Sequence, residues 1–406
     1  MKLSILNSVW QRDLIIQWIA TIYVAILGFI LSVFLARELG VEGFGNYSYV
    51  ISLVSIFFII QDGGFKTLIF RDSVDNKPGN LISFGIGYLI CTSVIAFLII
   101  VFFQPEFWPS ILVALNCMGL MVICEFVSSQ LKGKGDFKSD AIFKMAIRSF
   151  TAFGILFALF FFKTNSIISL FIAWSIALIF ALIWPIHKGY LKWPNFNFKS
   201  DLVKSNFIFL SIDIATVLYF RIDIILLKFF GNIDGDIGQY SAAYRILEGI
   251  ILLATPLAMI SFRILRLNSR NKHKFFQLIG LLLLSMLFIA TIIVSIGALW
   301  GSNFMVYIFG PEYLVAGDLL IWLLLAVFFI LPNYILAQGA IALNKEISYA
   351  KIVVIVAFLN VIMNIILIPD FGSKGAAWAT VIAEGILFFS LVMMLWNERK
   401  SLTSRL

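Results

Sequence analysis

Long apolar runs separated by short polar segments follow one another along the whole sequence. Twelve of these runs have close to the ~20 residues that a helix needs to cross a hydrocarbon core about 30 Å thick. They cover approximately residues 14–36, 44–62, 81–103, 109–130, 141–162, 167–187, 205–230, 239–260, 276–300, 318–341, 352–369 and 375–396. Turn-forming sequences such as Gly310-Pro311-Glu312 separate them. The pattern predicts an all-α polytopic membrane protein with about twelve transmembrane helices.

The composition excludes a soluble domain, and the positions of Lys and Arg predict the orientation of the chain in the membrane. Hydrophobic residues make up 61% of the chain and charged residues 13%, with a mean hydropathy of +1.01. Most Lys and Arg residues lie in alternate connections, for example at Lys66, Lys132, Lys192, Arg266 and Lys345. Because cytoplasmic loops retain positive charge, we expect both termini to be cytoplasmic. Topology therefore accounts for the net charge of +8, and nucleic acid is not an expected partner.

Cysteine and histidine offer no catalytic or metal-binding pattern. Cys91, Cys117 and Cys124 all lie inside apolar runs, where free cysteine is usually a small buried hydrophobe. His187 and His273 each stand beside a lysine at the end of a predicted helix. We therefore expect no catalytic residue, no metal and no cofactor.

A short internal repeat divides the chain into two halves. Gly45-Asn46-Tyr47-Ser48 opens the second predicted helix, and Gly238-Gln239-Tyr240-Ser241 opens the eighth. Both copies follow an odd-numbered helix, so they have the same orientation and indicate a parallel repeat. Neighbouring glycines permit tight turns between antiparallel helices. We expect two pseudo-symmetric six-helix bundles: an N-terminal lobe at 1–190, a cytoplasmic linker at 191–204 and a C-terminal lobe at 205–406.

Three stretches, taken in order, resemble the polysaccharide flippases, the Wzx-type branch of the MOP superfamily. They are LARELGVEGFGNYSYV near the start, FRIDIILLKFFG followed by GQYSAAYR in the middle, and near the end Asn360 and Asn364 followed by Ile368-Pro369, Gly372 and Gly375-Ala376-Ala377-x-Ala379-Thr380. The resemblance spans nearly the whole chain. It implies a two-lobed, inverted-V (MATE-like) transporter of the bacterial inner membrane, serving O-antigen, lipopolysaccharide, capsule or exopolysaccharide biosynthesis. The implied substrate is an undecaprenyl-diphosphate-linked oligosaccharide, with membrane lipids and other polysaccharide assembly proteins as further partners.

Three arginines inside the apolar runs are candidates for binding the substrate. Arg148, Arg221 and Arg245 each impose a cost of several kcal/mol unless they are paired or face water. A guanidinium stays charged and can hold diphosphate oxygens through two parallel hydrogen bonds. The alternative is structural pairing, with Glu248 as a partner for either Arg245 or Arg221. Because Arg148 has no acid three or four positions away, it is the cleaner substrate candidate.

Acidic and amide side chains also lie within the apolar runs. A carboxyl group in a low-dielectric cavity can take up a proton near neutral pH. Asn360 and Asn364 share one helical face, and we favour interhelical hydrogen bonding for them over sugar contact. The candidates for proton coupling or ion pairing are Glu125, Asp213, Asp223, Glu248 and Glu384.

Three functions are compatible with these patterns: a lipid-linked oligosaccharide flippase, a MATE-like multidrug or metabolite antiporter, and a membrane enzyme such as a glycan polymerase or glycosyltransferase. Fold alone does not separate the first two. An enzyme of that kind normally needs a large outer loop or an acidic pair at the outer surface. The longest expected outer connection, Gly301 to Gly317, has Glu312 as its only acid. We therefore expect a flippase that works by alternating access, and not an enzyme.

Overall fold

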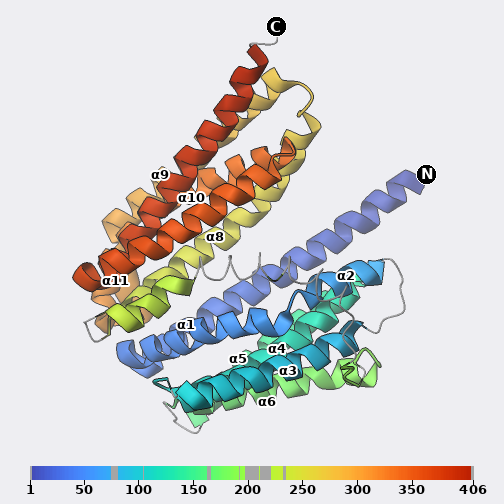
Figure 1. Ribbon diagram of the computed structural model, residues 1–406, viewed down its shortest axis with the longest axis vertical. Coiled ribbons are helices and arrows are strands. Elements are labelled where there is room, and N and C mark those ends of the chain that lie inside the picture. The colour runs from blue at the N-terminus through green and yellow to red at the C-terminus, as the bar shows by residue number, and fades with distance from the viewer. Residues whose placement is uncertain are drawn as a thin grey trace. The chain divides into compact units, whose positions relative to one another are not determined.

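A computed structural model describes residues 2–74, 81–103, 105–161, 166–191, 193–196, 210, 221–231 and 235–403 (Figure 1). Within these ranges all regular elements are helical. The chain divides into two units, and each is described by itself. Unit 1 comprises Met1–Leu39 and Tyr49–Arg221, and unit 2 comprises Gly40–Ser48 and Ile222–Leu406.

Unit 1 consists of six labelled helices, shown in blue to green in Figure 1. They are α1 (Lys2–Asp62, without residues 40–48), α2 (Phe65–Val74), α3 (Leu81–Phe103), α4 (Trp108–Gly133), α5 (Phe137–Phe161) and α6 (Ile167–His187). α4 is the central helix, because α2, α3, α5 and α6 all pack against it. Small residues such as Ala114 and Cys117 line its buried surface and allow close helix packing.

A glycine kink divides α1 into two helices. Gly40 has φ 67° and ψ −179°, a backbone conformation that is costly for residues with a Cβ atom. The next nine-residue stretch, Gly40–Ser48, is the part of α1 that belongs to unit 2. We call it the 40–48 segment. The chain therefore leaves unit 1 at Leu39 and returns to it at Tyr49.

Unit 2 is built around α10 (Leu314–Ala342), against which α8 (Asp236–Leu267), α9 (Lys272–Phe309) and α11 (Glu346–Thr403) pack. A short 3₁₀ turn, η1 (Pro311–Tyr313), joins α9 to α10, and residues 222–230 are also helical. α11 contains two helices joined at Gly372, which has φ 56°. Gly317 lies against the backbone of Ser302, so α9 and α10 approach closely.

The predicted spans can be compared with the described helices. Eight continuous helical segments of the described residues are long and apolar enough to cross a membrane. Two of them, covering Ile15–Asp62 and Glu346–Arg399, each contain two helices that meet at the kinked glycine. α8 covers the predicted run at 239–260. Most of the predicted run at 205–230 lies outside the described residues.

The apolar run predicted at 276–300 ends before its helix does, and the outer connection expected from Gly301 to Gly317 is partly helical. Residues 301–309 continue α9, and the chain turns only at Gly310 and η1. The reason is that no helix-breaking residue occurs in 302–309, whereas Gly310 has φ 117° and is followed by a proline. The connection is thus shorter than the sequence pattern indicated.

Candidate functional site

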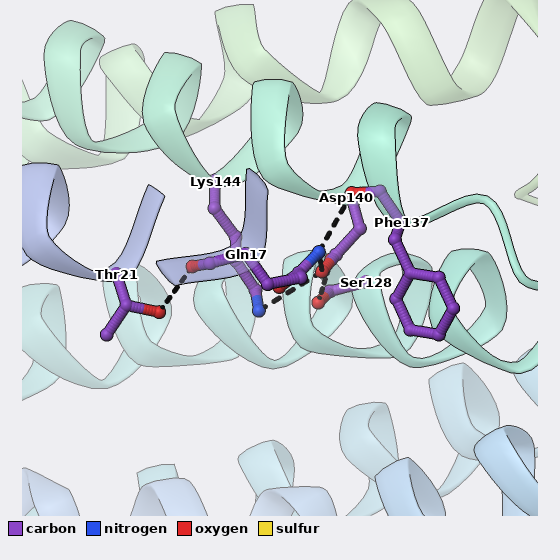
Figure 2. Close-up of polar contacts among 6 residues, drawn as sticks. All are labelled: Gln17, Thr21, Ser128, Phe137, Asp140 and Lys144. Carbon is purple, nitrogen blue, oxygen red and sulfur yellow. Dashed lines mark hydrogen bonds and ion pairs between the residues drawn. The ribbon is translucent and has the colours of Figure 1, made fainter. Parts of the chain in front are cut away.

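A fully buried carboxylate, Asp140, organises the polar core of unit 1 (Figure 2). Its Oδ2 atom accepts a hydrogen bond of 2.9 Å from Nε2 of Gln17 and lies 3.2 Å from Nζ of Lys144. Its Oδ1 atom accepts a hydrogen bond of 2.5 Å from the hydroxyl of Ser128. Three donors from α1, α4 and α5 therefore compensate the buried charge, as a carboxylate in a low-dielectric interior requires.

We call Gln17, Ser128, Asp140 and Lys144 the Asp140 cluster. Gln17 Nε2 also donates to the carbonyl of Phe137 at 2.8 Å, so one amide ties α1 to the first turn of α5. Sequence reasoning missed Asp140, because it lies just before the apolar run that predicted α5. The available signal was the Asp140–Lys144 spacing of four residues, which places the two side chains on one helical face.

Arg148 lies one helical turn beyond Lys144 and faces the same neighbour, α1. A Cβ atom built on Gly28 would lie 3.0 Å from Cζ and 3.2 Å from Nε of Arg148. The guanidinium therefore lies directly over the Cα atom of Gly28, in a space that any other residue would fill. The Arg148 side chain is partly exposed. Asp140, Lys144 and Arg148 thus follow one another along the surface of α5 that meets α1, which we call the α1–α5 seam.

Glu125 is partly buried on α4. The carboxylate is close enough to interact electrostatically with Cys124 and with Lys132 on the same helix. Lys132 also interacts with Asp140 and Lys144. Glu125 therefore lies in the same part of unit 1 as the Asp140 cluster.

In unit 2, Arg245 forms an ion pair with Glu248. Nη1 of Arg245 lies 2.7 Å from Oε2 of Glu248 on the same face of α8, and both side chains are partly exposed. This is the structural pairing that the spacing of three residues allowed. Tyr47, from the 40–48 segment, is also near Arg245. The Arg245–Glu248 pair thus lies beside the 40–48 segment within unit 2.

Asp223 is buried against the beginning of α8. It accepts a hydrogen bond from the hydroxyl of Tyr240, which is fully buried and also contacts the side chain of Thr380. Arg221, two residues earlier, is partly buried. Asp213, the remaining acid of the predicted run at 205–230, lies outside the described residues.

Glu384 is buried between α10 and α11. Nδ2 of Asn333 donates to Oε2 of Glu384 at 2.8 Å and to its carbonyl at 3.0 Å. The two asparagines singled out in the sequence bond to each other within α11: Nδ2 of Asn364 donates to the carbonyl of Asn360 at 3.0 Å and to Oδ1 at 3.1 Å. The expectation of an interhelical bond for this pair is thus corrected to an intrahelical one, since a spacing of four residues brings the two amides together on one helix.

The two copies of the internal repeat meet inside unit 2. A Cβ atom on Gly45 would lie 2.8 Å from the backbone nitrogen of Gly238, and one on Gly238 would collide with the carbonyl of Val41. Phe44 packs edge-on against Tyr313, with 6.5 Å between ring centroids. The glycines therefore allow the 40–48 segment to approach the beginning of α8 backbone to backbone, in addition to forming turns.

Buried hydrogen bonds hold the surrounding helix ends in place. Asp236, at the start of α8, accepts from the backbone nitrogen of Ser373 at 2.7 Å and from its hydroxyl at 2.5 Å. The side chain of Gln239 donates to the carbonyl of Glu312 at 2.7 Å and accepts from the backbone nitrogen of Ala316 at 2.8 Å. The surface that receives the 40–48 segment is thus a fixed part of unit 2. Sequence reasoning had placed Asp236 in a loop and did not identify this network.

Comparisons with known proteins agree with the sequence patterns. A family model described as "Polysaccharide biosynthesis protein" matches residues 11–263. A relative from Haloferax volcanii, "Probable low-salt glycan biosynthesis flippase Agl15", is 27% identical over 391 residues, which are 92% of this chain and 81% of the relative.

Solved structures show the same fold at low sequence identity. The "Lipid II flippase MurJ, inward closed conformation" has a TM-score of 0.74 and 19% identity, covering 94% of this chain and 87% of that one. An inward-facing multidrug resistance MATE family transporter of the MOP superfamily has a TM-score of 0.72 and 12% identity, covering 95% and 97%. These likenesses confirm the predicted fold class, an all-helical membrane protein with two pseudo-symmetric halves.

Proposed function

The chain belongs to the polysaccharide biosynthesis protein family, as the resemblance to Wzx-type flippases predicted, and from this premise we propose that it moves a lipid-linked oligosaccharide from one membrane leaflet to the other. The observation that carries the proposal is the family match over residues 11–263. The flippase named for the relative from Haloferax volcanii supports it. On this proposal the protein is a transporter and not an enzyme.

We propose an undecaprenyl-diphosphate-linked oligosaccharide as the substrate, carried across the bacterial inner membrane by alternating access of the two lobes. An N-terminal lobe at 1–190 and a C-terminal lobe at 205–406, linked by 191–204, would be the moving parts. The likeness to the MATE transporter leaves drug or metabolite antiport as the alternative, because both types of transporter share this fold. The family match favours the flippase.

Arg148 is the residue that we propose binds the diphosphate first. Nη2 is the Arg148 atom nearest to the space left by Gly28, and the side chain is partly exposed. The fork of donors on a guanidinium suits two phosphate oxygens better than an ammonium does.

Arg245 and Arg221 are proposed to contact the diphosphate at a later stage. Arg245 is held by Glu248 at 2.7 Å in the described state. A diphosphate with two negative charges would compete with one carboxylate for the guanidinium, so binding and release become an exchange of partners. The acids Glu125, Asp213, Asp223 and Glu384 stay candidates for proton coupling.

The orientation is also a proposal, with both termini in the cytoplasm. It rests on the concentration of Lys and Arg in alternate connections. A cysteine introduced at Glu312, an exposed residue of the η1 turn between α9 and α10, should react with an impermeant thiol reagent in intact cells, whereas one at Ser269 should not. Labelling at Ser269 alone would reverse the orientation.

Deleting the gene tests the function as a whole. A flippase mutant should accumulate lipid-linked oligosaccharide that faces the cytoplasm and should lose the corresponding surface polysaccharide. If the glycan profile stays unchanged in a strain without a duplicate transporter, while export of a drug or metabolite is lost, the antiporter is the correct assignment.

A further inference from the structure

One end of unit 2 contains a small polar pocket at the level where its helices end. The pocket has a volume of about 190 Å³ and is lined by Ser269, Lys272, Phe276, Leu343, Asn344 and Glu398. These residues come from the α8–α9 turn, the first turns of α9, the α10–α11 turn and the last turns of α11. The pocket is therefore bounded by segments that adjoin the apolar spans.

Hydrogen bonds fix the rim of this pocket. Nη1 of Arg266 donates to the carbonyl of Ala342 and to Oδ1 of Asn344, each at 2.7 Å. Asn344 has φ 57°, a left-handed conformation that asparagine tolerates better than most residues. Because its Oδ1 accepts from Arg266, the NH₂ group of the Asn344 amide is the part available as a donor. The turn thus presents a preformed hydrogen-bond donor to the pocket.

The start of α9, beside the pocket, carries positive charge that does not stabilise the helix. α9 begins with Lys272-His273-Lys274 and has no acid in its first turn. A helix N-terminus disfavours cations, because the macrodipole places partial positive charge there. The side chain of Asn271 already accepts from the backbone nitrogen of Lys274, and the macrodipole attracts anions to this end of the helix. Lys272 and the N-terminal end of α9 therefore both attract an anionic group placed in the pocket.

The pocket's remaining residues suit a lipid headgroup better than a free ion. Glu398 lies 2.7 Å from Lys345, so its charge is compensated, and its carboxylate can accept from a hydroxyl group. Phe276 and Leu343 supply an apolar wall. The guanidinium of Arg399 lies 5.5 Å from the ring of Trp396, an exposed tryptophan of the kind that marks the membrane interface.

We propose that this pocket binds the headgroup of an anionic phospholipid, with Lys272 and Asn344 on the phosphate and Glu398 on a headgroup hydroxyl. The inference is independent of the transported substrate. It assigns a lipid-binding site to one end of unit 2, at which a bound lipid links the α8–α9 turn to the α10–α11 turn and stabilises the unit.

The test is thermal unfolding of the purified full-length protein in detergent, titrated with phosphatidylglycerol or phosphatidylcholine. Phosphatidylglycerol should raise the unfolding midpoint in a saturable way, and phosphatidylcholine should not. Lys272→Ala should weaken the apparent affinity for phosphatidylglycerol roughly tenfold, since a charge-assisted hydrogen bond is worth about a factor of ten. Lys272→Arg should retain most of it.

Lys274→Ala is the matched control, because it removes the same charge from the same exposed helix start without removing a residue that lines the pocket. Its affinity for phosphatidylglycerol should stay close to that of the unmodified protein. Equal losses for the two alanine variants would show a diffuse attraction and overturn the site. Equal stabilisation by soluble glycerol 3-phosphate would assign the pocket to a free phosphate compound and overturn the lipid proposal.

Discussion

Replacing Asp140 with alanine should destabilise unit 1 strongly. The carboxylate is fully buried and is engaged by Gln17, Ser128 and Lys144. Removing one member of a buried charged pair costs about 3–5 kcal/mol, because the partner's charge is left uncompensated. Lys144 is partly exposed and can extend toward solvent, and Gln17 keeps its bond to Phe137. We therefore expect the lower end of that range, about 3 kcal/mol.

This cost converts into a measurable shift of the unfolding midpoint. For a domain of 150–250 residues, each kcal/mol lowers the midpoint by about 2–4 °C, so Asp140→Ala should lower it by roughly 6–12 °C. Asp140→Asn should fall between this variant and the unmodified protein, since the amide keeps an acceptor and loses the charge. Intrinsic tryptophan fluorescence during heating of the purified protein in detergent would report the shift.

Asp136→Ala is the control at the same end of α5. The Asp136 side chain accepts a hydrogen bond from the backbone nitrogen of Ser139 at 3.1 Å, and its two backbone hydrogen bonds do not depend on the carboxylate. The loss of such a cap costs about 1 kcal/mol, or roughly 2–4 °C here. If Asp140→Ala unfolds no earlier than Asp136→Ala, the carboxylate does not stabilise the fold, and the reasoning from its burial and hydrogen bonds is refuted.

Two glycine substitutions test close contacts, one in each unit, and a third is their control. Gly28→Ala should reduce transport at least roughly tenfold, about as much as Arg148→Ala, because a Cβ atom would displace the Arg148 guanidinium. Normal transport by Gly28→Ala in cells would contradict this positioning role. Gly45→Ala should force the 40–48 segment away from Gly238, increasing the rate of cysteine labelling or proteolysis within the segment, and unchanged rates would contradict the contact. Gly280→Ala, which has open space around it, should leave transport and the labelling rate unchanged.

The helices were predictable because a bilayer leaves the chain few alternatives. Backbone groups in hydrocarbon must be hydrogen-bonded internally, so each long apolar run forms a helix and Gly or Pro marks its end. The same rule explains the error at 301–309. These residues contain apolar and polar side chains that helices accept equally well, and only the Gly310-Pro311 pair stops α9.

The candidate site was predictable only where its contacts are local. The Arg245–Glu248 pair follows from a spacing of three residues on one helix. The contact of Gln17 with Asp140 joins positions more than a hundred residues apart, and periodicity does not indicate which helices become neighbours. Likewise, the repeat identified Gly45 and Gly238 as equivalent positions, but their contact depends on how the 40–48 segment packs in unit 2.

Translocation in proteoliposomes tests the central claim most directly. The purified protein would be reconstituted with undecaprenyl-diphosphate-linked oligosaccharide in both leaflets, and an impermeant reagent that oxidises sugars would be added outside. Active flippase should make nearly all of the substrate reactive, whereas empty liposomes and the Arg148→Ala protein should leave about half protected. Protection of the same half in liposomes with the active protein, under every ion gradient applied, would contradict the account.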